Sequence, residues 1–263
     1  MGRDHSISGI MTGLAVMEIL DFTGHHPTPA AYLTAPVIVA GAALLPDWDH
    51  PNAIAAHTFG PLSRGIAHIL NWLGEVLFAL TATPYDTPRR DGHRLITHTA
   101  WFAAIMWGAT WLSCQWSDPW GRRVVLFLCV GLALRGLAGS WAKRNGWLVV
   151  TALAAALAWA GARFIAELDA VTLGWLIALG CFTHCLGDSC TLDGCPWLAP
   201  LKIRGQRWYR IGTPRWMRFR TGTEEIDGED YLRGAMLYVA LPVLVLLWAV
   251  VLSPFPALHL LAR

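Results

Sequence analysis

The stretch LLPDWDHP, residues 44–51, joins a hydrophobic run to a cluster of metal-binding side chains. The apolar run stops at Pro46, and Asp47, Asp49 and His50 follow directly after it. Carboxylate oxygens combined with an imidazole nitrogen suit Zn²⁺, Mn²⁺ or Fe²⁺ better than Ca²⁺, which takes oxygen ligands. The sequence therefore predicts a set of metal ligands at the end of a membrane helix.

Further candidate ligands also lie at the ends of apolar segments. His93 and His98 precede the apolar stretch 99–114, and His184 and Asp188 close another. The i,i+4 spacing of His184 and Asp188 places both side chains on one helical face, where they can share an ion. A single His or Asp at a helix end is more often a cap, but their joint occurrence favours a metal site. The predicted ligands are His5, Asp47, Asp49, His50, His93, His98, His184 and Asp188.

The composition is that of a membrane protein. The chain is 55% hydrophobic with 15 Trp and only 14% charged residues, well below the roughly 25% of a soluble domain. Glu18 and Asp21 interrupt the first apolar segment, so we expect no cleavable signal peptide and a retained first helix. Segments that approach the roughly 20 apolar residues of a membrane span are 99–116, 124–141, 147–165, 171–187 and 235–252. The shorter segments 7–20 and 31–45 are either spans or helices buried within the bundle.

The expected fold is all-α, a polytopic membrane helical bundle with a small basic cytoplasmic hairpin loop. We expect residues 1–263 to form a single membrane-embedded domain that includes this loop at 190–234. Residues 206–220 indicate two short strands around Gly-Thr-Pro, and an acidic turn should follow at 224–230. The arginines and aromatics of the hairpin would suit anionic headgroups or a phosphorylated substrate, or would only fix the topology. Binding of nucleic acid is not expected.

Basic residues predict the orientation. They gather at Arg89, Arg90 and Arg94, at Lys143 and Arg144, and throughout 202–233. Alternation of the five longer spans puts these regions on one side, which the positive-inside rule makes cytoplasmic; only Arg122 and Arg123 disagree. The predicted ligands then meet at the cytoplasmic face of the membrane. His5 joins them if the first two helices form a hairpin.

Residues 64–83 do not fit as a span, because crossing there would separate Asp47 from His93. The polar residues of this segment form one narrow stripe at helical spacing: Arg64, His68, Asn71 and Glu75. We expect the segment to lie in the interface or to re-enter. The stripe faces the headgroups, or His68 and Glu75 turn inward as extra ligands or a general base.

Cysteines give an alternative ligand set. Cys114, Cys129, Cys181 and Cys185 lie in apolar segments and are expected to be small buried hydrophobes. A zinc knuckle is conceivable, but none of its spacings matches the usual CxxC pattern. Its members would be His184, Cys185, Cys190 and Cys195.

The candidate ligands fall in motifs separated by apolar segments: His5 with Gly9, LLPDWDHPN at 44–52, GHRLITHT at 92–99, and THCLGDSCTLDG at 183–194 followed by Leu198 and Pro200. In this order they resemble the bacterial inner-membrane predicted metal-dependent hydrolases of the YdjM-like family. The resemblance covers residues 5–200 and implies a helical membrane protein with a hydrolase site. A more distant resemblance, to zinc-dependent phospholipase C and P1-type nucleases, implies phosphoester chemistry. This chain does not show the full ligand pattern of those secreted enzymes. Its basic segment after Leu198 has no counterpart in the families that it resembles.

These features predict a membrane-bound metal-dependent hydrolase that acts through metal-activated water. Its substrate would be a phosphoester or other ester of a lipid or lipid-linked molecule, and Zn²⁺ is the expected cofactor, with Mn²⁺ or Fe²⁺ as alternatives. Eight ligands are too many for one ion, so we expect two ions or several orienting residues. Asp49 and His98 are expected in orienting or acid/base roles. Arg94 would stabilise charge on a phosphate or anchor the topology, and Asp193 with Thr191 would cap a turn.

Two other functions fit the same residues. A non-catalytic membrane protein stabilised by a structural metal would have no open coordination position. A divalent-metal transporter would hold its ligands near the middle of the membrane, whereas these lie at helix ends. The identity of the substrate, the number of ions and the oligomeric state do not follow from the sequence.

Overall fold

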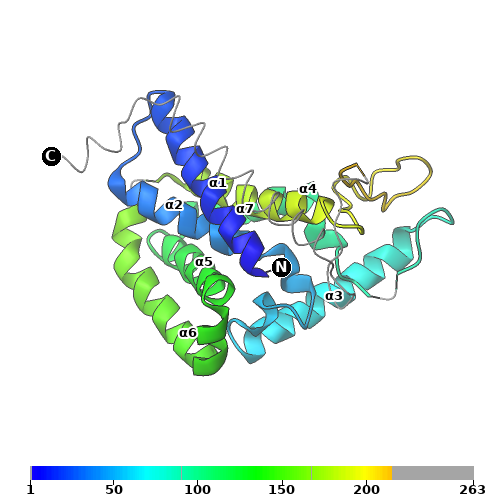
Figure 1. The fold of residues 1–263 in the computed structure, drawn as a ribbon, viewed down its shortest axis with the longest axis horizontal. Helices are drawn as coiled ribbons and strands as arrows, with labels where there is room; N and C mark the ends of the chain where they lie inside the picture. Colours follow the sequence, from blue (N-terminus) through cyan, green and yellow to red (C-terminus); the bar gives the residue numbers. More distant parts are fainter. Residues whose placement is uncertain (1, 90, 167, 215–263) are drawn as a thin grey trace.

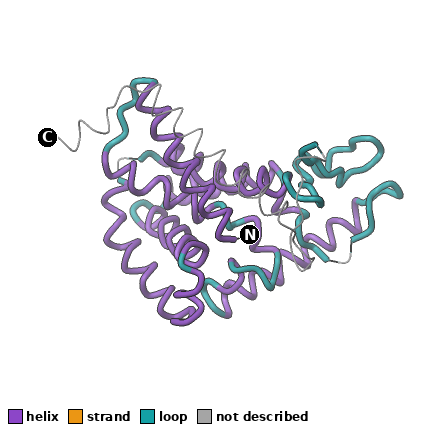
Figure 2. The backbone as a smooth tube through the Cα atoms, in the orientation of Figure 1, coloured by secondary structure: helices purple, strands orange, loops and turns teal. Residues whose placement is uncertain are grey.

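The computed structural model describes residues 2–89, 91–166 and 168–214, and this part of the chain is helical without a strand (Figure 2). The expected all-α fold is confirmed. Figure 1 labels α1 (Gly2–Phe22), α2 (Pro29–Ala42), α3 (Pro61–Thr81), α4 (Ala100–Trp116), α5 (Trp120–Leu137), α6 (Gly139–Gly161) and α7 (Ala170–Ser189). Short 3-10 helices η1 (Pro46–Asp49), η2 (Ala55–His57), η3 (Ile96–His98) and η4 (Ala162–Ile165) lie between them. The expected span 235–252 and acidic turn 224–230 lie outside the described residues.

Helix α2 is the centre of the bundle and packs against α1, α5 and α7. The contacts are close because glycines face α2: a Cβ on Gly9 of α1 would lie 2.6 Å from the Cα of Ala40. Gly180 of α7 would likewise clash with Ala42. Small residues let membrane helices approach closely, since lipid supplies no hydrophobic drive for their association. This packing brings the start of α1, the end of α2 and the end of α7 together.

Within the described residues, three segments are long and apolar enough to cross a membrane: Pro29–Asp49, Gly139–Ile165 and Ala170–Ser189. They contain the expected segments 31–45, 147–165 and 171–187. Gly146, at φ 77°, interrupts α6, so its long apolar part starts at Trp147.

The other two spans expected in the described part are 99–116 and 124–141. The first coincides with α4, and the second overlaps α5 and the start of α6. Neither α4 nor α5 is among the helices long and apolar enough to cross a membrane. Helix α4 has 17 residues, about 26 Å of helix against a hydrocarbon core of about 30 Å. Helix α5 carries three charged residues, Arg122, Arg123 and Arg135, which are unfavourable in a membrane span. It ends at Leu137, and a separate helix begins at Gly139. The short segment 7–20 lies within α1, which also falls outside the spanning candidates.

Helix α3 lies at the side of the bundle and packs on η1, η2 and η3 (Figure 1). Ser63, Ala67 and Gly74 form its buried face. His68 and Glu75 are exposed, so the alternative in which they turn inward as ligands is wrong. Since α3 is not among the spanning candidates, its location in the membrane interface stays a prediction.

The loop after α7 folds back beside the end of α3. Isolated antiparallel bridges join Cys195 to Ile211 and Ile203 to Gln206, and the turn at Arg204 and Gly205 has positive φ at both residues. The hairpin predicted for 206–220 is wrong in its described half, because 206–211 form no strand. The carboxylate of Asp86 accepts the backbone N–H groups of residues 207 and 208, which are then not available to a partner strand.

Candidate metal centre

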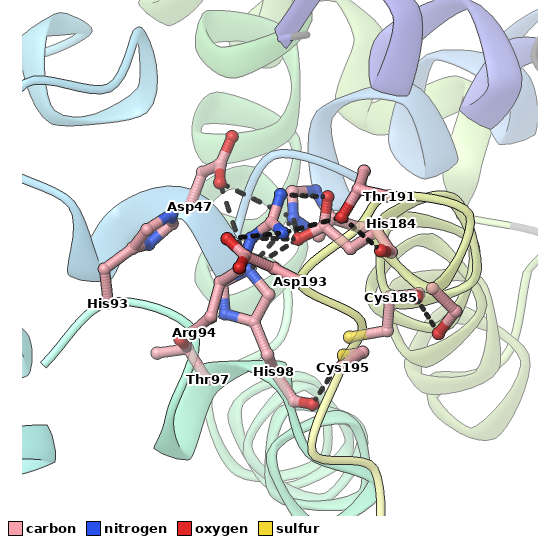
Figure 3. A network of polar contacts seen from close by, with 12 residues as sticks. Asp47, His93, Arg94, Thr97, His98, His184, Cys185, Thr191, Asp193 and Cys195 are labelled. Atoms are coloured by element: carbon pink, nitrogen blue, oxygen red, sulfur yellow. Dashed lines mark hydrogen bonds and ion pairs between the residues drawn. The ribbon is translucent and has the colours of Figure 1, made fainter. Parts of the chain in front are cut away.

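Seven of the eight predicted ligands come together from all four motifs. Figure 3 labels four of them, Asp47, His93, His98 and His184. They are His5 of α1, Asp47 and Asp49 of η1, His93, His98 of η3, and His184 and Asp188 of α7. The eighth, His50, is partly buried and contacts this group only at its edge: its ring stacks on that of His93, with 4.5 Å between the ring centroids. The folded chain thus gathers ligands that the sequence places far apart.

Two groups of three donors each have their ligand atoms within 4.8 Å of one another. We call His5, His184 and Asp188 the helical triad, since all three belong to α1 or α7. We call Asp47, His93 and His98 the loop triad, since they come from 3-10 turns and the loop before η3. The triads adjoin: the Nε2 atoms of His98 and His184 are 3.2 Å apart.

The donor atoms at this junction have the spacing of a tetrahedral site. His184 Nε2 lies 3.5 Å from Asp188 Oδ2 and 3.5 Å from Asp47 Oδ1. His98 Nε2 lies 3.2 Å from Asp188 Oδ2 and 4.0 Å from Asp47 Oδ1. A tetrahedral ion with bonds of about 2.1 Å holds its ligand atoms about 3.4 Å apart. Two imidazoles and two carboxylates therefore fit one divalent ion here.

Both central imidazoles are held by their far nitrogen. His184 Nδ1 lies 2.7 Å from the carbonyl oxygen of Ala43, which can only accept, so this nitrogen carries a proton and the neutral ring presents a lone pair at Nε2. His98 Nδ1 lies 3.0 Å from Thr97 Oγ1 and 3.5 Å from Asp49 Oδ2. Metal-binding histidines usually have such a carbonyl or carboxylate partner on the second nitrogen.

The charge of the site favours a cation. Asp47, Asp49 and Asp188 contribute three carboxylates, and Arg94 is the buried guanidinium paired with them. With neutral imidazoles the group has a charge of −2, which is costly to bury unless it is balanced. Burial alone would lower the pKa of His98, but Asp49 and Asp188 outweigh burial and raise it well above its ordinary value. The same field would stabilise a divalent ion.

Arg94 fixes the carboxylate of Asp188. Its Nε lies 2.9 Å from Asp188 Oδ2, its Nη2 donates to Asp188 Oδ1 at 2.9 Å, and its Nη1 donates to Thr191. One charge-assisted hydrogen bond and one close ion-pair contact thus hold the carboxylate, while Asp188 Oδ2 accepts no hydrogen bond from the described residues. Arg94 is 6% exposed, so the expectation that it anchors the topology at the membrane surface is wrong. The predicted cap is confirmed at Thr191, whose hydroxyl donates to the Asp188 carbonyl.

Asp49 binds the residues that surround the centre. Its Oδ1 accepts from His93 Nδ1 at 2.8 Å, and its Oδ2 accepts from the backbone N–H of Arg94 and from the hydroxyl of Thr97. Its carbonyl accepts from Asn71 of α3. Asp49 therefore lies where an orienting residue is needed, whereas His98 presents a nitrogen to the centre itself.

Sequence reasoning missed Thr97 and the inward turn of Asn71. The only signal for Thr97 is its position between the two histidines of GHRLITHT. The zinc-knuckle alternative is wrong for the described residues, because neither donor group contains a cysteine. Cys195 instead points its thiol at the carbonyl of His98, 3.0 Å away, and Cys190 at that of Leu186.

Fold and site together define an all-helical membrane protein with a buried His/Asp centre. The chain belongs to the YdjM inner membrane protein family, whose model matches residues 1–143 and 146–255. The expected kinship with YdjM-like proteins is thus confirmed. No curated protein and no solved structure matches the chain. The family description names a membrane and not a reaction.

Proposed function

We propose that the protein is a membrane-bound metal-dependent hydrolase that cleaves a phosphoester or other ester of a lipid or lipid-linked substrate. The mixed nitrogen and oxygen donors suit Zn²⁺ first, with Mn²⁺ and Fe²⁺ as alternatives. When bound, such an ion polarises an ester oxygen and supplies a water whose pKa is lowered towards neutrality. The residues around the centre hold the ion and orient its ligands.

The open side of the centre carries this proposal. Asp47 and His93 are 18% and 23% exposed in their side chains, whereas His98, His184 and Asp188 are at most 1% exposed. Structural zinc sites are closed by their protein ligands, while catalytic sites keep one position open for water and substrate. An asymmetric site of this kind favours hydrolysis over a purely structural metal.

The roles of the side chains follow from their contacts. Asp188, held by Arg94, and His184, held by the Ala43 carbonyl, are the fixed ligands. His93, which lies beside Asp47 and His98, donates a hydrogen bond from Nδ1 to Asp49, so in the neutral ring its Nε2 keeps a lone pair. That atom can bind the ion or take a proton from water on the open side.

The location of the donors supports a reaction at a membrane surface. They lie at the start of α1, after the end of α2 and in the last turns of α7. A transporter would hold them near the middle of its spans. The basic residues Arg89, Lys143 and Lys202 support the cytoplasmic side for this surface, from which a lipid ester of the inner leaflet can be reached.

The test is metal content by elemental mass spectrometry on detergent-purified protein, together with hydrolysis of phospholipids and short-chain esters. Wild type is compared with Asp47→Ala and His184→Ala, and with His68→Ala as the matched control on exposed α3. We expect about one or two Zn²⁺ per chain in the wild type. This metal should be lost in Asp47→Ala and His184→Ala and retained in His68→Ala. Chelation should abolish hydrolysis and metal should restore it. Tightly held metal without hydrolysis of any ester would contradict the proposal, and so would the absence of metal.

A further inference from the structure

An apolar groove of about 300 Å³ lies beside the metal centre, between the end of α3, the start of α4 and the loop after α7. Figure 1 shows the end of α3 and this loop on the same side of the bundle. The groove is lined mainly by Leu77, Ile96, Thr99, Trp101, Ile105 and Trp208. Ile96 and Thr99 stand on either side of the His98 region in the chain, so one wall of the groove is continuous with η3.

The groove offers a ligand almost no polar contact, because the polar atoms of three lining side chains are used within the protein. The Thr99 hydroxyl donates to the Ile96 carbonyl and accepts from the backbone of Phe102. The Thr81 hydroxyl donates to the Leu77 carbonyl and accepts from the indole N–H of Trp208. A polar ligand would lose its hydrogen bonds to water here and gain none. A hydrocarbon chain would lose nothing.

The lips of the groove carry exposed apolar side chains. Trp101 and Ile105 of α4 are 55% and 66% exposed, and Leu77 of α3 is 41% exposed. In a membrane protein such side chains contact lipid. A lipid chain can therefore enter the groove from the side without crossing water.

A basic pocket adjoins the apolar groove, and Trp208 lines both. This pocket is smaller, about 120 Å³, and its other walls include Arg89, Tyr209 and Arg210. Arginine suits phosphate and carboxylate groups. An apolar groove and a basic pocket that share one wall match an amphiphile with a hydrocarbon chain and an anionic headgroup.

We propose that the apolar groove binds one hydrocarbon chain of an anionic membrane lipid whose ester lies at the metal centre. This inference rests on the proposed hydrolase function and names its class of substrate. The groove selects the chain, and the exposed edge at Asp47 and His93 receives the ester.

The first test is the dependence of kcat/KM on chain length for a series of short-chain phosphatidylglycerols, presented as monomers in water below their critical micelle concentration to the full-length, metal-loaded protein in amphipol. Each methylene buried in the groove should raise kcat/KM about threefold to fourfold, up to a plateau when the groove is full. A value of kcat/KM independent of chain length would overturn the proposal.

The second test fills the groove. Ile105→Trp should lower the ratio of kcat/KM for the long-chain lipid to kcat/KM for a short-chain ester about tenfold. Ala104→Trp is the matched control, since Ala104 is the preceding residue of α4 but lines a separate apolar groove against α7. An effect of Ala104→Trp alone would assign the chain to that other groove and overturn the proposal.

A third measurement separates failure of the groove from failure of the hydrolase. Phosphatidylglycerol with a diazirine at the end of its chain is photolysed in nanodiscs with wild type and with Ile105→Trp, and the labelled peptides are mapped. We expect label on Leu77 and Trp101 in wild type and its loss in the variant, whether or not any ester is cleaved. Label elsewhere would overturn the proposal. So would efficient disulfide capture of Ile105→Cys by a cysteine introduced within 235–252, which would assign the groove to this chain's own segment.

Discussion

The helical triad and the loop triad contribute to one centre but are supported in different ways. His5, His184 and Asp188 project from α1 and α7, which close glycine contacts with α2 hold in place, and they are at most 1% exposed. Asp47, His93 and His98 belong to 3-10 turns and a loop, and the first two are partly exposed. Regular helices give the more rigid support, whereas short turns give access. Under the proposed function, both triads supply ligands to the ion, the helical triad supplies the more rigid ones, and the loop triad also leaves the side that is open to the substrate.

The largest effect is expected from breaking the helical triad at Asp188. Asp188→Ala leaves Arg94 as an uncompensated buried charge, so it should lower the free energy of unfolding by about 3–5 kcal/mol and abolish metal binding. Chemical unfolding in detergent and elemental analysis measure the two effects. Combining Asp188→Ala with Arg94→Met should recover much of the stability but none of the metal. If Asp188→Ala alone is as stable as wild type, the ion pair between Asp188 and Arg94 does not stabilise the helical triad.

A selective effect on the loop triad is expected from Asp49→Asn. The amide keeps the shape of the side chain but loses the carboxylate that holds His93, Thr97 and the backbone of Arg94. Metal affinity should fall about 10–100-fold, as it does when such supporting residues are removed. Competition with a chromophoric chelator measures the affinity. Asp169→Asn, at the exposed N-cap of α7, is the control because asparagine caps a helix as well as aspartate does, and an equal loss in that variant would mean that overall charge is responsible.

A smaller effect is expected at Thr97, which contacts the same carboxylate. Thr97→Val removes the hydroxyl while keeping the shape, and should cost about 1–2 kcal/mol of stability with a weaker loss of metal than Asp49→Asn. Thr97→Ser keeps the hydroxyl and should retain the affinity. Equal behaviour of the two variants in the same chelator competition would show that the hydroxyl does not orient the loop triad.

The smallest effect concerns residues 199–214 of the loop after α7, and it depends on pH. Burial would raise the pKa of Asp86, but hydrogen bonds from Thr83 and from the backbone of Trp208 outweigh burial and lower it. A lowered pKa means that the stabilisation is present above the ordinary value of about 3.9 and is lost as the pH falls through the folded-state value. The protection factors of the backbone amides of 199–214, which are corrected for the intrinsic exchange rate at each pH, should therefore fall below about pH 4. Asp86→Asn should remove this pH dependence, and an unchanged profile would exclude Asp86 as its cause.

Local patterns predicted much of the fold and the ligand set. Apolar segment length placed most of the described helices, and the i,i+4 spacing of His184 and Asp188 placed two ligands on one face of α7. The same patterns were less informative for α4 and α5, because α4 stops at 17 residues and α5 contains three arginines and ends at Leu137, inside the apolar stretch 124–141. They failed at 206–211, where Asp86, more than a hundred residues earlier, takes the N–H groups that a strand would use.

The sequence by itself determined that this is a helical membrane protein with His and Asp donors at its helix ends, because hydrophobic segment length and residue chemistry are local properties. Tertiary structure alone decided that these donors meet in two triads, that Arg94 is buried against Asp188, and that Thr97 and Asn71 support Asp49. It also placed an apolar groove beside His98. Each of these depends on contacts between distant segments, and the close packing of glycines around α2 sets the distances at which such contacts form.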